Sequence, residues 1–150
     1  MNSFLKVLAA LQAIGGVAGI VLLAHNHGRS ALSGELGLWN KLIFCFLLGL
    51  FVLATWGGIA FLRRPKSRPM ILEVALLLQV ISVSFSGFAY EFYSGFKAPF
   101  GLVGDKFGIR ANIGSNAFLG FPQTAPFSFT INLGALIFLV LFTKATRADQ

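Results

Sequence analysis

The sequence predicts an all-α membrane protein built as a bundle of four transmembrane helices, and two observations support this. Four apolar runs of about twenty residues lie at 4–24, 42–62, 70–93 and 125–143, and about 20 apolar residues in a helix cross a hydrocarbon core. The 150-residue chain is also 56% hydrophobic and only 11% charged. Because the four spans use most of the chain, we expect one transmembrane domain over residues 1–150.

The first run carries small residues at a spacing typical of helix packing. Gly15 and Gly19 are four residues apart, which lets two helix backbones approach closely. We expect this seam to pack within the bundle, with homodimerisation as the alternative. The run is longer than the apolar core of a signal peptide, so we interpret it as a retained helix.

Polar residues of the third run recur at steps of three and four, as on one face of a helix. Gln79, Ser82 and Ser86 belong to this stripe, which we expect to face other helices because polar groups are costly against lipid. Asn132 of the fourth run is the expected hydrogen-bond partner of Gln79. The same stripe would also suit a channel for a lipid or small ligand.

Basic residues predict the orientation. The link between the second and third runs carries Arg63, Arg64, Lys66 and Arg68, and cytoplasmic loops are enriched in such cations. We therefore expect both termini and this link on the cytoplasmic side of a bacterial inner membrane, with the four cations against lipid headgroups. Five further cations fall on the other side: Arg29, Lys41, Lys97, Lys106 and Arg110. Since topology explains the positive charge, nucleic-acid binding is not indicated.

The outer segment 94–125 is too long for a simple connection and contains six glycines and five phenylalanines. Around Phe107 and Ile109 apolar and other residues alternate, and Gly104-Asp105 precedes them as a turn. This pattern predicts a short β-hairpin. Because an isolated hairpin is marginally stable, we expect it to lean on the bundle or on another subunit.

His25 and His27 form the one histidine pair in the sequence. Two imidazoles separated by one residue can bind a transition metal from an extended backbone, and Glu91 at the same outer mouth could complete the site. Two solvated histidines at a helix exit are the simpler interpretation. The sequence identifies no cofactor.

The favoured function is a non-catalytic accessory or assembly subunit of a larger membrane complex, with a bioenergetic complex as one candidate. Transport is disfavoured because no ionisable residue lies near the middle of a span. We expect contacts with membrane lipids and with other membrane subunits through the 94–125 segment and the helix faces. The alternative is a small membrane redox enzyme, or a quinone- or metal-binding protein, with its site at the outer mouth.

Overall fold

The computed structural model describes residues 3–33, 37–64 and 70–148, which form helices at both ends of the chain and a sheet between them. The helices are α1 (Ser3–Leu32), α2 (Leu38–Arg63), α3 (Met70–Val80) and α4 (Leu133–Ala148). The strands are β1 (Ile81–Phe85), β2 (Phe88–Lys97), β3 (Pro99–Val103), β4 (Lys106–Ile109), β5 (Asn112–Gly120) and β6 (Ser128–Asn132).

The predicted all-α bundle of four transmembrane helices is wrong. Within the described residues, only α1 and α2 are long and apolar enough to cross a membrane. The third apolar run is divided among α3, β1 and the first part of β2, and the fourth is divided between β6 and α4. Residues 81–132 supply a six-stranded antiparallel sheet instead of a small outer cap.

The change from helix to strand at Ile81 has a local cause. Branched and aromatic residues alternate with serines in β1, and β-branched and aromatic residues fit the pleated surface of a sheet. Gly87 then adopts a φ of 92° in the turn to β2, a conformation that glycine adopts without steric cost. The polar stripe expected on one helix therefore does not exist, because Ser82 lies in β1 and Ser86 lies in the turn.

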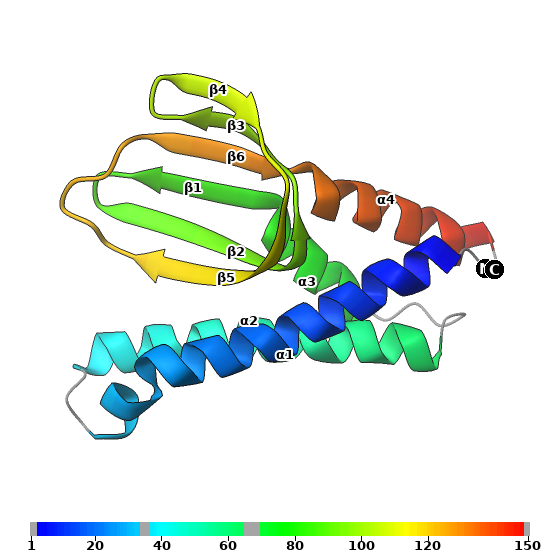
Figure 1. Ribbon diagram of the computed structural model, residues 1–150, viewed down its shortest axis with the longest axis horizontal. Coiled ribbons are helices and arrows are strands. Elements are labelled where there is room, and N and C mark those ends of the chain that lie inside the picture. The colour runs from blue at the N-terminus through cyan, green and yellow to red at the C-terminus, as the bar shows by residue number, and fades with distance from the viewer. Residues whose placement is uncertain (1–2, 34–36, 65–69, 149–150) are drawn as a thin grey trace.

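The sheet has the strand order β4-β3-β6-β1-β2-β5. The hairpin expected at Gly104-Asp105 is present, with Phe100 opposite Ile109 and Leu102 opposite Phe107. The two edge strands, β4 and β5, follow one another in the chain and are joined through residues 110–111. The sheet therefore curls until its edges meet at one end, near the start of α4, while they diverge at the other end (Figure 1).

The four helices pack together at the end of the molecule where both chain termini lie (Figure 1). Their core is a cluster of buried apolar side chains from all four helices. At its centre the rings of Phe61 and Phe142 meet edge to face at 5.1 Å between centroids. The four helices thus share one apolar core at this end, to which α3 and α4 contribute as short helices.

The middle parts of α1 and α2 pack on the outer face of β2 and β5. Phe92 of β2 is fully buried there, with its ring 5.5 Å from that of Phe51 in α2. Gly15 of α1 lies against the backbone of Gly95 in β2, and Ser94 Oγ donates a hydrogen bond to the Gln12 carbonyl. One face of the sheet is therefore attached to the two long helices.

Of the predicted packing residues, Gly19 lies against another helix as expected, whereas the others have different neighbours. Gly19 contacts the Phe51 ring of α2, whereas Gly15 packs on a strand. Gln79 is buried, donating to the Ala75 carbonyl and accepting from the Ser94 amide. The expected bond from Gln79 to Asn132 does not form, because Asn132 Oδ1 accepts the backbone amides of Ala98 and Ala135. Asn132 instead joins β6 to the start of α4.

Candidate functional site: the concave face of the sheet

The strand register assigns side chains to two faces of very different chemistry. Ser82 lies opposite Thr130 and Ser84 lies opposite Ser128, so these four hydroxyls share the inner, concave face. The register of β2 with β5 places Glu91, Lys97, Asn112 and Asn116 on that face as well. The inner face thus carries hydroxyl, amide and charged side chains among apolar ones such as Val103 and Phe118.

The inner face lines an open cavity of about 770 Å³, which is within the range of small-ligand sites. Small closed barrels fill their interior with side chains, but here many inward positions are small. The small residues that line the space are Ser82, Ser84, Ala89, Gly101, Gly108, Ser128 and Thr130. The curled sheet therefore holds open space instead of a packed core.

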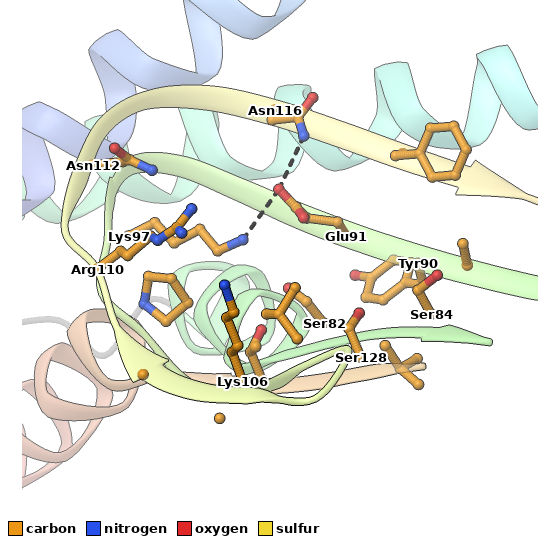
Figure 2. Close-up of a pocket in the computed structure, with 18 of the residues that line it drawn as sticks. Ser82, Ser84, Tyr90, Glu91, Lys97, Lys106, Arg110, Asn112, Asn116 and Ser128 are labelled. Atoms are coloured by element: carbon orange, nitrogen blue, oxygen red, sulfur yellow. Dashed lines mark hydrogen bonds and ion pairs between the residues drawn. The ribbon is translucent and has the colours of Figure 1, made fainter. Parts of the chain in front are cut away.

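Lys97 is the buried cation of this cavity, with only 9% of its side chain exposed. Its Nζ lies 3.1 Å from Glu91 Oε1 and 5.0 Å from the centre of the Tyr93 ring. Asn116 Nδ2 donates to the same carboxylate oxygen at 3.0 Å (Figure 2). Burial and the Glu91 charge raise the pKa of the Tyr93 hydroxyl, so this ring stays neutral beside the ion pair.

Two further cations line the cavity from the other edge of the sheet. Lys106 begins β4, and Arg110 follows its last residue. Both side chains are directed toward the space that Lys97 and Glu91 enter from β2 (Figure 2). Among the described residues neither side chain forms an ion pair. The cavity lining therefore carries three cations against one carboxylate.

The outer face of β1, β6, β3 and β4 is apolar and largely uncovered. Phe107 is 65% exposed and Ile109 is 63% exposed, and the Phe107 ring meets that of Phe100 edge to face. Six large apolar side chains are exposed on this surface: Ile81, Phe85, Phe100, Phe107, Ile109 and Phe129. We call these six residues the outer apolar face.

The structure separates the three residues predicted to bind a metal. His25 and His27 are exposed on α1, and two positions on a helix are about 200° apart around its axis, so the pair does not present an extended chelate. Glu91 is held by Lys97 and Asn116. No group of three potential metal ligands forms within the described residues. The metal site stays a prediction without a geometry to support it.

The predicted headgroup-binding residues lie at the end of α2 or outside the described residues. Arg63 is the last residue of α2 and Arg64 caps it, at the end of the molecule where the two termini lie (Figure 1). Lys66 and Arg68 fall outside the described residues. Their contact with lipid headgroups and their use as orientation signals stay predictions.

Sequence reasoning missed the cavity because it assigned 70–93 to one helix. The signal was nevertheless present, since serine occupies every second position of β1 and Lys106, Gly108 and Arg110 alternate with apolar residues. Alternation of this kind separates two faces of a strand.

A comparison of the chain with protein families, curated proteins and solved structures finds no match. The site is therefore interpreted from its geometry alone.

Proposed function

We propose that this chain is a non-catalytic subunit of a membrane protein complex. In this proposal α1 and α2 anchor it in the bilayer, and the outer apolar face contacts a partner subunit. The observation that carries the proposal is the exposure of six large apolar side chains on four adjacent strands. Large contiguous apolar patches on a protein surface mark interaction sites.

The properties of this surface favour a protein partner over both water and lipid. Water does not favour the exposed rings of Phe100 and Phe107. Lipid tails would accept the rings but cannot bond the backbone groups of an edge strand, and β4 is an edge of the sheet. A partner protein satisfies both requirements, because it can cover the apolar face and pair with the edge.

The orientation we propose follows from the positions of the charges. Lys6, Arg63, Arg64 and Lys144 lie on helix segments that meet at the end holding both termini. Because cations favour the cytoplasmic side, this end is placed in the cytoplasm of a bacterial cell, with α1 and α2 crossing the inner membrane. The divergent end of the sheet then points toward the opposite side.

Native mass tests this proposal directly. The protein is extracted in a mild detergent from its own membrane, and its assembly is measured by native electrophoresis. We expect Phe107→Glu to release the chain from a larger assembly, because a carboxylate on the outer apolar face cannot be buried against a partner without a partner charge. A photoreactive amino acid at Phe107 should capture the neighbouring subunit.

The matched control is Ser86→Glu, which adds the same charge at an exposed position in the turn after β1. This variant should retain the native mass of the wild type. Membrane insertion of both variants is checked by carbonate extraction. A Phe107→Glu protein that is inserted and keeps the wild-type native mass would contradict the proposal.

A further inference from the structure

We propose that the concave cavity is a binding site for a phosphate group, with Arg110 and Lys106 as its principal charged contacts. The inference goes beyond the docking role proposed for the outer face and does not depend on it. The strand register places Lys106 and Gly108 on the concave side and Phe107 and Ile109 on the outer side, although Phe107 also borders the cavity.

The charges of the lining favour an anion. Glu91 is the one carboxylate among the lining residues, and it is already paired with Lys97. Lys106 and Arg110 have no such partner among the described residues. Lys106 and Arg110 are exposed to solvent at the open side of the cavity, and an anion between two such cations removes their mutual repulsion.

The donors around these cations match the oxygens of a phosphate. The planar fork of Arg110 can donate to two oxygens at once, as guanidinium groups do with phosphate. Asn112 and Asn116 supply amide groups from β5. The floor of the cavity, formed by β1 and β6, supplies the hydroxyls of Ser84, Ser128 and Thr130. The cavity therefore offers charge together with several neutral donors, and the small floor residues leave room for the rest of a ligand.

Binding is measured on the full chain in phosphatidylcholine nanodiscs by isothermal titration calorimetry. Inorganic phosphate is the first probe. A second set of nanodiscs containing phosphatidylglycerol is analysed by native mass spectrometry for retained lipid. Binding of inorganic phosphate would identify a soluble phosphate ligand, whereas retention of phosphatidylglycerol alone would identify a lipid headgroup. Either result supports the proposal, and binding of neither probe overturns it.

Two kinds of variant locate the site. Arg110→Gln combined with Lys106→Gln should weaken binding by about tenfold or more, because two charge-assisted contacts are lost. Gly108→Phe changes no charge but should reduce binding as strongly, since a Cβ at Gly108 meets no atom within 4 Å and the ring would occupy the cavity. Lys41→Gln, which removes a cation in the first turns of α2, should bind as the wild type does.

These variants keep the experiment decisive if one of them folds poorly. Circular dichroism and native mass identify such a variant, and the other then supplies the result. Equal affinity of the wild type, the Arg110 and Lys106 double variant and Gly108→Phe would overturn the proposed site. A loss of affinity in Lys41→Gln equal to that in the double variant would also overturn it, because binding would then follow total charge.

Discussion

Gly15 of α1 lies directly on Gly95 of β2, so that a Cβ added at Gly15 would come within 2.8 Å of the Gly95 Cα. This contact fixes the distance between the first helix and the sheet. The side chain of Ser115 also reaches the Gly15 carbonyl, which attaches β5 at the same point. The helix and the two strands are therefore joined through backbone groups and short side chains.

A methyl group at this contact should weaken the fold. Gly15→Ala places its Cβ against backbone that has no side chain to move aside, and overpacking of this kind costs about 1–3 kcal/mol. The free energy of unfolding, measured in mixtures of dodecyl maltoside and SDS, should fall by that amount. Gly49→Ala is the control, because its Cβ meets nothing within 4 Å, and it should stabilise α2 by about 0.5–1 kcal/mol.

The two buried glutamines of the bundle should respond differently to replacement by leucine. Gln79→Leu leaves the buried Ser94 amide without its acceptor and should cost about 1–3 kcal/mol. Gln12→Leu removes an Nε2 that has no partner within the described residues, so it should be close to neutral or stabilising. Unfolding of both variants under the same conditions tests this, and a larger loss for Gln12→Leu would contradict our assignment of the hydrogen bonds.

The ion pair in the cavity should show an asymmetry between its two partners. Glu91→Gln leaves the Lys97 ammonium without its carboxylate while the Lys97 side chain is only 9% exposed, which should cost about 2 kcal/mol. Lys97→Met should cost less, because Glu91 is 34% exposed and keeps its bond from Asn116. Thermal unfolding of the two single variants and of the double variant measures the interaction free energy between Glu91 and Lys97. Our account is wrong if Lys97→Met is the more damaging change.

The turn between β3 and β4 should tolerate asparagine but not valine. Gly104 has a φ of 60°, a conformation that asparagine adopts with little cost and that a β-branched residue avoids. Gly104→Val should cost about 1–2 kcal/mol locally and speed amide hydrogen exchange in β3 and β4. Gly104→Asn should leave that exchange near the wild-type rate, and equal exchange in both variants would refute the role of this turn.

Length and hydropathy were sufficient to predict α1 and α2, since each continues its apolar character over many helical turns. Local alternation was sufficient to predict the hairpin of β3 and β4. The third run was misassigned because two patterns overlap in it. Gln79, Ser82 and Ser86 recur at a helical spacing. Ile81, Val83 and Phe85 alternate as the residues of a strand do, and neither pattern is the clearer one. Hydropathy alone does not separate these patterns, and period-two alternation beside the Ser86-Gly87 turn was the deciding signal.

The cavity was less accessible to sequence reasoning than the helices. Its floor forms only when β1 pairs with β6, and the two strands are separated by more than forty residues of chain. No local pattern in either strand specifies that pairing. Alternation places Lys106 and Arg110 on one face of a strand, but only the curl of the whole sheet makes that face concave, so they were interpreted as cations of an outer segment.

The absence of a loop between α3 and β1, and between β6 and α4, has a mechanical consequence. A flexible connection would absorb a displacement of either helix, but here each helix continues directly into one of two adjacent central strands. A tilt of α3 relative to α4 is therefore transmitted to the hydroxyl-lined floor between Ser82 and Thr130. Forces applied to the bundle end reach the interior of the curled sheet as a shear between its two middle strands.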